Sequence, residues 1–436
     1  MNVIVVGAGY VGLVAACCLA SEGYQVTCVE KNPQKLDKLS NGISTICEKD
    51  LDGLLASLVA GKRLSFTPHL PYPLKTDVIM VAVGTPSLAS GATDLSNVYK
   101  FCAELRDVVT EPLILVMKST VPPGTGIRLL DRYFKEKRIS YVANPEFLRE
   151  GQAIYDWFNP DRIVIGTNDS ESAALVRQLY PEKSIPQVIT DITSAETIKY
   201  AANAFLVTKI SFINEISNFC EMMDADIDDV ARGIGLDSRI GRHFLRAGVG
   251  YGGSCFPKDV RALDFYCMST GYDFRLLKSC IEVNTRQRMM IVQKLRRLLR
   301  NLSGSKIALL GLAFKPETDD VRESPAISIA HLLREEGVHI VAYDPMAMEK
   351  ARQELPPDIF LGRDLYSTAK GVNAICLLTE WSEFVAADWV AIKNNMQPPY
   401  ALVDGRNCLE QEKLVSLGFN YTGMGRRISP ALELCR

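Results

Sequence analysis

The sequence of 436 residues has few histidines, no C-x-x-C motif and almost no net charge. Its four histidines are scattered, and no two of its twelve cysteines form a C-x-x-C pair, so we expect neither a zinc site nor a disulfide framework. The 49 basic and 51 acidic residues give a net charge of −2, which provides no electrostatic signature of nucleic-acid binding. A reduced, cytoplasmic compartment is the default for such cysteine usage.

The apolar beginning of the chain lacks the features of a targeting or membrane-spanning segment. No basic region precedes the first twenty residues, glycines interrupt them, and Ser21-Glu22-Gly23 ends the run. A signal peptide needs the basic region, and a spanning helix needs an uninterrupted apolar stretch. We therefore expect no targeting segment and no membrane contact. A chain of this length is expected to hold two or three domains.

A glycine-rich motif lies between a predicted strand and a predicted helix near the beginning of the chain. A strand-like run at 2–6 leads into G-x-G-x-x-G at 7–12, and a helix-like stretch follows. A second strand at 25–29 ends at Glu30, which is 18 residues after the last glycine. This context is typical of a dinucleotide-binding unit. The alternative is a tight turn in another kind of α/β protein.

Each residue of this motif has a physical reason to be there. Gly7 makes the tight turn, Gly9 lets a pyrophosphate approach the backbone, and Gly12 lets the helix pack on the strand. The helix N-terminus attracts phosphate. Glu30 would bind the adenosine ribose hydroxyls and repel a 2′-phosphate, so the motif predicts NAD rather than NADP as the cofactor.

Strand-like and helix-like segments then alternate, which predicts a mostly parallel, doubly wound sheet. Ligands of such sheets bind at the carboxyl ends of the strands. Thr85 and Thr120 follow two of these strands, so we expect them to point toward the cofactor; a backbone cap is the alternative. The expected strands and helices are, in turn, 78–83, 96–109, 113–117, about 126–137, 162–165 and 170–179.

Long helical patterns replace the strands in the middle of the chain. They run from about 194 to 223 and from about 276 to 302. On the first, Lys199 and Asn203 are four residues apart and share a face. Such a pair could simply be exposed to solvent, or it could stabilise a negatively charged oxygen beside a nucleophile.

The strongest sign of catalysis is the segment 249–259, VGYGGSCFPKD. Its glycines permit backbone angles and close approaches that a Cβ would forbid. Pro257 suits the first helical position and a helical pattern follows, so Cys255 would lie at a helix N-terminus beside Lys258. Both features favour the thiolate, the nucleophilic form of cysteine. The alternative is a small buried hydrophobic residue.

A second α/β unit is expected after about residue 304. The strand-like run and turn at 306–314 repeat the N-terminal pattern, and a strand at 338–343 ends at Asp344. A polar loop at 315–325 stands where the glycine fingerprint would continue, which predicts a Rossmann-like domain that binds a different nucleotide. Further strands are expected at 374–378 and 401–403.

Together, these segments resemble the UDP-glucose/GDP-mannose dehydrogenase family. The matching stretches cover nearly the whole chain in the same order and spacing: GAGYVGL, GTPS, KSTVPPGT, PEFLREG, KYAANAF, DSRIG, GYGGSCFPKD, GLAFKPETDDVRESP and DGRN. The GSCFPKD form resembles the UDP-glucose branch more than the N-acetylmannosamine branch, which usually has a histidine before the cysteine. Cys47-Glu48-Lys49-Asp50 departs from the Tyr-Glu-Pro-Gly type of turn in relatives, and Tyr251 replaces a common phenylalanine.

The resemblance implies an α/β fold with two Rossmann-like doubly wound domains joined by a long-helix central region. The implied domains are NAD-binding (1–193), central dimerisation and active-site (194–303) and UDP-sugar-binding (304–436). The implied activity is the oxidation of UDP-glucose to UDP-glucuronate by two NAD⁺, through a cysteine thiohemiacetal and thioester, in a homodimer or higher homo-oligomer. The alternatives are a dehydrogenase of another nucleotide sugar (UDP-N-acetylhexosamine or GDP-mannose) and a non-catalytic dinucleotide sensor.

The resemblance also implies roles for residues in the matching motifs, and no metal. Cys255 is the implied nucleophile, Lys199 and Asn203 stabilise oxyanions, and Asp259 and Thr120 hold the catalytic water. Glu146 is a candidate acid or base, and Arg239 would reach the substrate of a neighbouring subunit. The implied cofactor-binding residues are Gly7, Gly9, Tyr10, Val11, Gly12, Glu30, Lys31, Thr85, Thr120, Glu150, Lys258 and Arg322. The implied substrate-binding residues are Glu146, Phe147, Leu148, Arg149, Glu150, Lys199, Asn203, Arg239, Phe244, Tyr251, Gly252, Lys315 and Arg406.

Overall fold

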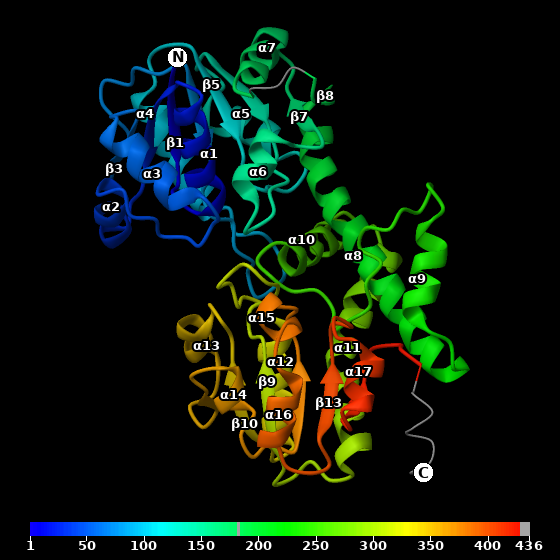
Figure 1. Ribbon diagram of the computed structural model, residues 1–436. Helices are drawn as coiled ribbons and strands as arrows, with labels where there is room; N and C mark the ends of the chain where they lie inside the picture. Colours follow the sequence, from blue (N-terminus) through cyan, green and yellow to red (C-terminus); the bar gives the residue numbers. More distant parts are fainter. Residues whose placement is uncertain (181–183, 428–436) are drawn as a thin grey trace. The chain divides into compact units, whose positions relative to one another are not determined.

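The computed structural model describes residues 1–180 and 184–427. The chain divides into two compact units, the first made of Met1–Ala202 and Arg261–Gly271 and the second of Asn203–Val260 and Tyr272–Arg436. Two helices, α8 (Ile192–Met223) and α10 (Phe256–Ser269), therefore contribute residues to both units. Figure 1 shows that each unit is built around its own sheet.

The sheet of the first unit has, in the described residues, eight strands in the order β3-β2-β1-β4-β5-β6-β7-β8. Its strand pairs are parallel except for β6 and β7, which are antiparallel. The strand order changes direction at β1, which is where doubly wound sheets bind nucleotides. The strands are β1 (Asn2–Val6), β2 (Gln25–Val29), β3 (Leu64–Thr67), β4 (Val78–Val81), β5 (Leu113–Met117), β6 (Ile139–Ala143), β7 (Ile163–Gly166) and β8 (Gln187–Thr190).

Side-chain caps begin the second and the seventh helix of the first unit. Asn32 accepts hydrogen bonds from the backbone N–H groups of Gln34 and Lys35, and Asp169 does the same for Glu171 and Ser172. These caps satisfy N–H groups that have no partner inside a helix. The helices are α1 (Tyr10–Ser21), α2 (Pro33–Ser40), α3 (Leu51–Ala60), α4 (Ser96–Val108), α5 (Thr125–Tyr133), α6 (Ala153–Phe158) and α7 (Ser170–Gln178).

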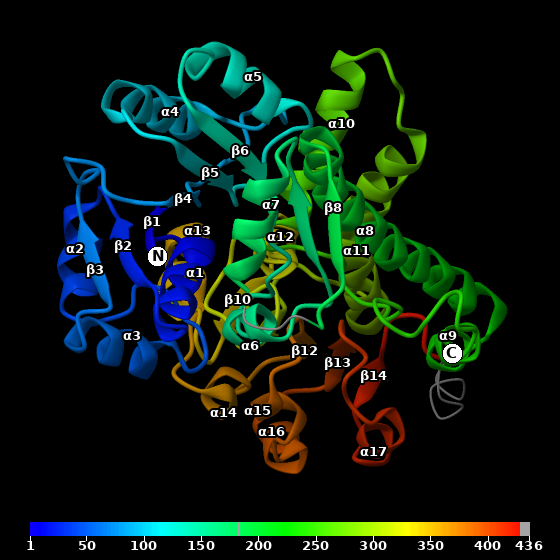
Figure 2. The same cartoon turned by 90° about the horizontal axis from the view of Figure 1, so that it is seen from above.

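Both faces of the first sheet are buried. Val3 and Val5 of β1 belong to a core that includes residues of α1 and α3, whereas Ile4 and Val6 belong to a second core with residues of α4 and α5. Successive side chains of a strand point to opposite faces, so helices must cover both. Figure 2 shows α1 and α7 on one side of the strands and α4 and α5 on the other. The predicted doubly wound sheet is confirmed.

The sheet of the second unit has, in the described residues, six parallel strands in the order β11-β10-β9-β12-β13-β14. This order is that of a Rossmann fold, as predicted. The strands are β9 (Lys306–Leu310), β10 (His339–Tyr343), β11 (Phe360–Leu361), β12 (Ala374–Leu377), β13 (Ala401–Asp404) and β14 (Asn420–Thr422). The helices are α9 (Ile227–Gly235), α11 (Arg275–Leu299), α12 (Pro325–Glu335), α13 (Met348–Glu354), α14 (Leu365–Thr368), α15 (Ser382–Val385), α16 (Trp389–Asn395) and α17 (Gln411–Ser416).

The turn after β9 explains why the second unit lacks a glycine fingerprint. Gly311 has φ +92, and a Cβ there would lie 2.4 Å from the Cβ of Thr379. The buried Asp344 carboxylate accepts hydrogen bonds from the N–H groups of Leu312 (2.7 Å) and Ala313 (2.9 Å). These N–H groups are therefore already paired with a carboxylate of the chain itself, where a dinucleotide-binding turn would offer them to phosphate.

Some predicted boundaries were wrong by a few residues. The strand predicted at 78–83 ends at Val81. The helix predicted at 126–137 ends at Tyr133, because Phe134 leaves helical angles and is buried. Helix α10 begins at Phe256, so Pro257 is its second residue rather than its first. The sequence patterns missed several short elements: β3, β8, α2, α3 and α6. Most of them are partly exposed and carry little apolar periodicity, but α3 has helical spacing at Leu51, Leu54, Leu55 and Leu58 and was not predicted.

The described residues lack a membrane-spanning helix, a cluster of metal ligands and a disulfide. No helix in 1–180 and 184–427 is long and apolar enough to cross a membrane. Within the same ranges, no group of three or more His, Cys, Asp and Glu side chains is arranged to hold a metal ion. No disulfide joins two of the cysteines that the structure describes.

Candidate active site

The glycine-rich turn of the first unit has the geometry that a pyrophosphate requires. Gly7 has φ +100, and a Cβ at Gly12 would lie 1.8 Å from the Gly7 carbonyl oxygen. Gly9 precedes α1, and no atom lies within 4 Å of where its Cβ would stand. The backbone is thus tightly packed beneath the turn and open at Gly9, with Tyr10 and Val11 in the first turn of the helix. These residues fit a dinucleotide.

Glu30 follows the carboxyl end of β2, as the dinucleotide motif requires. Its Oε1 accepts a hydrogen bond from the N–H of Asn32 (2.8 Å), which orients the carboxylate. The next residue, Lys31, forms an exposed ion pair with Glu104 (2.8 Å). A carboxylate at this position favours ribose hydroxyls over a 2′-phosphate.

Glu48, which lies in the segment that departs from the family pattern, holds the loop after Glu146. Its buried carboxylate accepts hydrogen bonds from the N–H groups of Gly151 and Ala153, both at 2.8 Å. The Tyr10 hydroxyl also accepts from Gly151 N–H (2.6 Å). The loop that carries Glu150 is therefore fastened to the glycine-rich turn. A glutamate in a predicted loop gave no signal of its burial.

Lys199 and Glu146 form a buried ion pair, with 3.0 Å between Nζ and Oε1. The other carboxylate oxygen accepts from the N–H of Leu148 (2.7 Å). Burial alone would raise the pKa of Glu146, but the Lys199 ammonium and the Leu148 N–H outweigh it and hold the pKa below its usual value. Glu146 is thus a carboxylate near neutral pH, which suits a base or an anchor for Lys199 rather than an acid.

The residues beside this ion pair also belong to the predicted site. The ring of Phe147 lies 5.3 Å from the Lys199 ammonium and 3.5 Å from the Arg162 guanidinium. Thr120 and Lys199 line the same small cavity, together with Pro145. The first unit therefore brings together Thr120, Glu146, Phe147 and Lys199, which the sequence had placed on three separate segments.

Glu196, one turn before Lys199 on α8, has a structural role that the sequence did not reveal. Its carboxylate accepts hydrogen bonds from the N–H groups of Thr125 (3.1 Å) and Gly126 (2.8 Å), at the beginning of α5. Burial raises the pKa of Glu196 to about 7, although these hydrogen bonds act in the opposite direction. Glu196 thus joins α8 to the segment that follows Thr120.

Two predicted site residues have partners of their own in the first unit. The Thr85 hydroxyl donates to the carbonyl of Thr120 (3.0 Å), which is the backbone contact weighed as the alternative. The Arg149 guanidinium binds both carboxylate oxygens of Asp156, at 3.0 and 2.6 Å. Roles of Thr85 in cofactor binding and of Arg149 in substrate binding stay predictions that compete with these contacts.

The turn before Cys255 depends on its glycines, as predicted. A Cβ at Gly250 (φ +96) would lie 2.3 Å from the side-chain oxygen of Asn284. A Cβ at Gly252 would lie 2.4 Å from the carbonyl oxygen of Glu323, and one at Gly253 (φ +85) would lie 2.7 Å from the Phe314 ring. The backbone therefore packs closely against Asn284, Glu323 and Phe314 just before Cys255, and no side chain fits at these three glycines.

Cys255 is exposed and immediately precedes α10. Its carbonyl accepts from the N–H of Asp259 (2.9 Å), so the two residues are one helical turn apart. The buried Asp259 carboxylate accepts from the Asn203 amide (2.6 Å) and from Lys258 Nζ (2.5 Å). The interpretation of Cys255 as a buried hydrophobic residue is wrong. Asn203, Lys258 and Asp259 form one polar cluster beside it.

Aromatic rings surround the start of α10. The rings of Tyr251 and Phe244 both meet Phe256 edge to face, with centroids 6.2 and 6.3 Å apart. Phe244 is a non-glycine residue with φ 66, a conformation that is costly unless the surroundings hold it. Tyr251 is buried, so the substitution of tyrosine for the common phenylalanine changes a packed position.

Arg406 follows β13 and lines a cavity of about 240 Å³ in the second unit. Its guanidinium donates to the carbonyls of Leu378 (2.7 Å) and Phe314 (2.9 Å), and it pairs with Glu380. Further arginines line the cavity, and their positive charge suits an anion such as a diphosphate. They are Arg232, Arg242 and Arg246.

Two other predicted cationic residues of the second unit lie nearer solvent. Arg239 is 87% exposed along its side chain and pairs with Asp237. Arg322 pairs with Asp320 and is also largely exposed. Lys315 lies 5.5 Å from the centre of the Phe314 ring.

Three family models match the chain in succession. They describe the NAD binding domain (residues 1–184), the central domain (193–286) and the UDP binding domain (308–411) of the UDP-glucose/GDP-mannose dehydrogenase family. The chain belongs to this family. Together with the open glycine-rich turn and Glu30, the membership establishes the first unit's sheet as an NAD-binding domain.

Relatives of this dehydrogenase family are similar over almost their whole length. The chain is 44% identical to UDP-glucose 6-dehydrogenase YwqF of Bacillus subtilis (strain 168), over 98% of each chain. It is also 44% identical to the UDP-glucose 6-dehydrogenase of Rhizobium meliloti (strain 1021), over 98% of this chain and 100% of that one. Among solved structures, a UDP-glucose dehydrogenase from the archaeon Pyrobaculum islandicum has 36% identity and a TM-score of 0.90, over 98% of each chain.

Proposed function

We propose that this chain oxidises UDP-glucose to UDP-glucuronate in two steps, with two NAD⁺ reduced for each substrate consumed. Full-length relatives with 44% identity are UDP-glucose 6-dehydrogenases. The observation that carries the chemistry is the exposed Cys255 at the beginning of α10, one turn before a buried Asp259 that Asn203 and Lys258 hold.

Cysteine chemistry explains how one alcohol carbon can be oxidised twice. The first oxidation takes a proton and a hydride from the C6 alcohol and leaves an aldehyde. A bond then forms between the Cys255 sulfur and C6, and the resulting thiohemiacetal can lose a second hydride to become a thioester. Water cleaves the carbon–sulfur bond, which releases the carboxylate and restores the thiol. NAD⁺, when bound, supplies the hydride acceptor for both oxidations.

We assign the charged oxygens and the water to side chains of the two clusters. Lys199 and Asn203 stabilise negative oxygen on C6, because an ammonium and an amide N–H are strong donors to an oxyanion. Asp259 and Thr120 hold the water that cleaves the thioester. Glu146, ionised by its pairing with Lys199, acts as a base or keeps Lys199 in place.

We further propose the binding residues and the assembly. NAD is bound by Gly7, Gly9, Gly12, Glu30 and the other predicted cofactor residues, and the diphosphate of the substrate by Lys315 and Arg406. Arg239, being exposed, is available to reach the substrate of a second subunit in a homodimer or higher homo-oligomer. The cytoplasm is the proposed compartment, and 1–193, 194–303 and 304–436 are the proposed domains.

The test is the stoichiometry of NADH production with a panel of UDP- and GDP-sugars. We expect two NADH for each UDP-glucose consumed, with UDP-N-acetylhexosamines and GDP-mannose far slower. One NADH per sugar would overturn the cysteine route, because the product would then be an aldehyde. Faster oxidation of another nucleotide sugar would overturn the substrate, and no NADH with any sugar would favour a dinucleotide sensor.

A further inference from the structure

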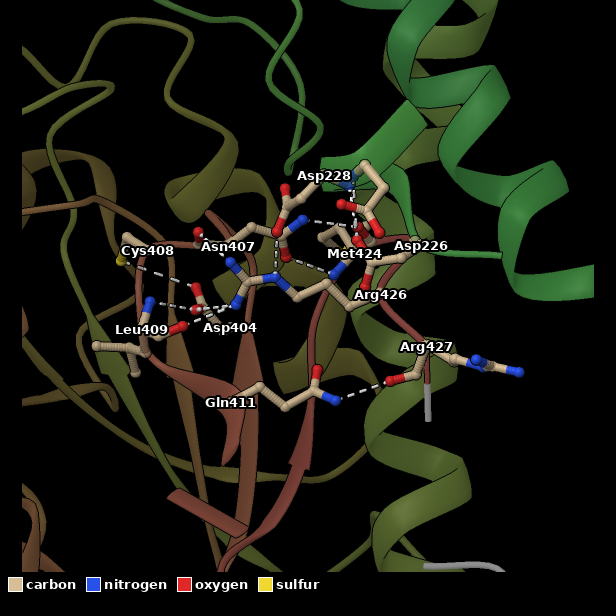
Figure 3. Close-up of polar contacts among 12 residues, drawn as sticks. Asp226, Asp228, Asp404, Asn407, Cys408, Leu409, Gln411, Met424, Arg426 and Arg427 are labelled. Atoms are coloured by element: carbon tan, nitrogen blue, oxygen red, sulfur yellow. Dashed lines mark hydrogen bonds and ion pairs between the residues drawn. The ribbon is translucent and has the colours of Figure 1, made fainter. Parts of the chain in front are cut away.

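Arg426, near the end of the described chain, is a largely buried arginine with partners on three segments (Figure 3). Its Nε donates to the Asp228 carboxylate (2.8 Å), and Nη1 donates to the Leu409 carbonyl and the Tyr421 hydroxyl, both at 2.7 Å. Nη2 donates to the carbonyl of Asn407 (2.7 Å). The side chain is 14% exposed. The planar guanidinium of arginine carries five N–H donors, so it can donate hydrogen bonds to several acceptors in different directions at once.

The loop 404–409, which carries Arg406, is organised around the buried Asp404 carboxylate. This carboxylate accepts from the N–H groups of Arg406 (3.1 Å) and Leu409 (2.9 Å) and from the Tyr421 hydroxyl (3.0 Å). Arg426 Nη1 lies 3.8 Å from it and supplies the balancing positive charge. A buried carboxylate without a cation is costly, so Arg426 stabilises the conformation that places Arg406.

The residues just before Arg426 hold the same loop and the beginning of α9. The Asn407 amide donates to the Met424 carbonyl (2.7 Å) and accepts from the Met424 N–H (2.8 Å). The Gly425 carbonyl accepts from the N–H of Ile227, the first residue of α9 (2.9 Å). The segment 424–426 therefore connects helix α9 to loop 404–409, as Figure 3 shows for the labelled residues.

Both of these elements line the arginine-rich cavity. Asp228 and Arg232 come from α9, and Arg406 and Asn407 come from loop 404–409. Arg426 itself does not line the cavity, but it bonds directly to two residues that do, Asp228 and Asn407. The Arg426 guanidinium is therefore a direct side-chain link between these two walls of the cavity, beside the hydrogen bonds of Met424 and Gly425.

We propose that Arg426 is a positioning residue for nucleotide-sugar binding: it fastens α9 to loop 404–409 and so sets where Arg406 meets the diphosphate. This inference rests on the proposed function in one respect, the assignment of Arg406 to the UDP-sugar. Arg426 touches neither the substrate nor the cofactor in this proposal. Its removal affects the affinity for UDP-glucose and UDP and leaves the chemistry at Cys255 unaffected.

The test compares Arg426→Gln with Arg427→Gln in the full-length enzyme. Arg427 is the matched control, because it is the next residue and pairs with the exposed Asp224, outside the cavity. For Arg426→Gln we expect the KM for UDP-glucose and the calorimetric Kd for UDP to rise about tenfold, with kcat and the KM for NAD⁺ changed less than about twofold. Arg427→Gln should change none of these constants by more than about twofold. Equal effects of the two variants would overturn the proposal, and so would a fall in kcat with both KM values unchanged.

Two further variants separate the possible failures. Asp228→Ala removes one hydrogen-bond partner of Arg426 at an exposed position, so the fold is expected to survive, and it should raise the KM for UDP-glucose about threefold if α9 must be fastened. An unchanged KM in folded Asp228→Ala would contradict that link. Arg406→Ala tests the underlying assignment: an unchanged Kd for UDP would remove Arg406 from the substrate site. A weakened Arg406→Ala beside an unaffected Arg426→Gln would overturn the positioning role alone.

Discussion

The ammonium of Lys199 lies 3.0 Å from the Glu146 carboxylate, and both side chains are buried. The two residues are 53 positions apart in the sequence. Burying a charge is costly, and in a buried ion pair each charge compensates the desolvation of the other. Removing one partner therefore leaves an uncompensated buried charge. Replacing one partner should therefore lower the unfolding free energy more than replacing both partners.

Replacing Lys199 by methionine should affect stability and catalysis together. We expect a loss of about 3–5 kcal/mol of unfolding free energy, since Glu146 is left buried and unpaired. We also expect kcat to fall by about 10²–10³, as for the loss of an oxyanion donor. The double variant Lys199→Met/Glu146→Gln should recover most of the stability but none of the activity. Urea unfolding and NADH formation measure the two effects, and wild-type turnover in Lys199→Met would remove Lys199 from the mechanism.

Replacing Cys255 by serine should stop the reaction before the second oxidation is completed. Serine is a poorer nucleophile toward the aldehyde, so we expect no more NADH than a single turnover per enzyme allows. Cys267→Ser, on the same helix α10, is the matched control and should keep full turnover. Burst amplitudes in stopped-flow absorbance measure this. Continuous turnover by Cys255→Ser would refute the assignment.

Glu196 should make the protein less stable as the pH rises toward neutrality. Its pKa in the folded state is about 7, above its ordinary value of 4.5, because burial disfavours the charged form. The folded state holds the proton more tightly, so the stability that Glu196 contributes is fully present below pH 4.5 and is lost as the pH rises to about 7. The loss is about 3 kcal/mol at one pKa unit per 1.36 kcal/mol. Urea unfolding at several pH values should show this slope in the wild type and a flatter one in Glu196→Gln.

Replacing Glu48 by alanine should loosen the loop that follows Glu146. The N–H of Ala153 then lacks its acceptor, and that of Gly151 keeps only the Tyr10 hydroxyl. Because Glu150 on this loop is a predicted ligand of both NAD and the UDP-sugar, we expect about tenfold higher KM values for both, equivalent to about 1.4 kcal/mol each. Lys49→Ala, at the exposed neighbouring position, is the control. Unchanged KM values in Glu48→Ala would contradict the role.

Replacing Gly12 by alanine should abolish NAD binding, because the added Cβ would lie 1.8 Å from the Gly7 carbonyl oxygen. The turn and α1 would have to separate, and the approach at Gly9 would be lost. Gly53→Ala is the control: it lies in α3 of the same unit with no atom within 4 Å of the new Cβ. That change should stabilise the fold by about 0.5–1 kcal/mol. Calorimetric NAD titrations and thermal unfolding test both expectations.

The sequence predicted most of the fold because its strands are short apolar runs that end at turn residues. The glycine-rich turn at 7–12, Cys255 before a helix and the second Rossmann-like sheet all depend on neighbours within a few residues. The short elements α2 and β3 were missed because they are partly exposed and carry weak periodicity. Helix α3 was missed although its leucines have helical spacing. The departure at Cys47–Asp50 drew attention to a turn, whereas its important residue, Glu48, acts through backbone groups about a hundred positions away.

Local chemistry is thus what the sequence determined by itself: which residues can turn tightly, begin a helix, carry a nucleophile or contact phosphate. Only the tertiary structure decided how those residues are charged and held. Lys199 meets Glu146, Asn203 meets Asp259, and Arg426 meets Asp228 across 198 positions. The physical reason is that burial and pairing set the state of an ionisable group, and both depend on which distant segments the packing of the core brings together.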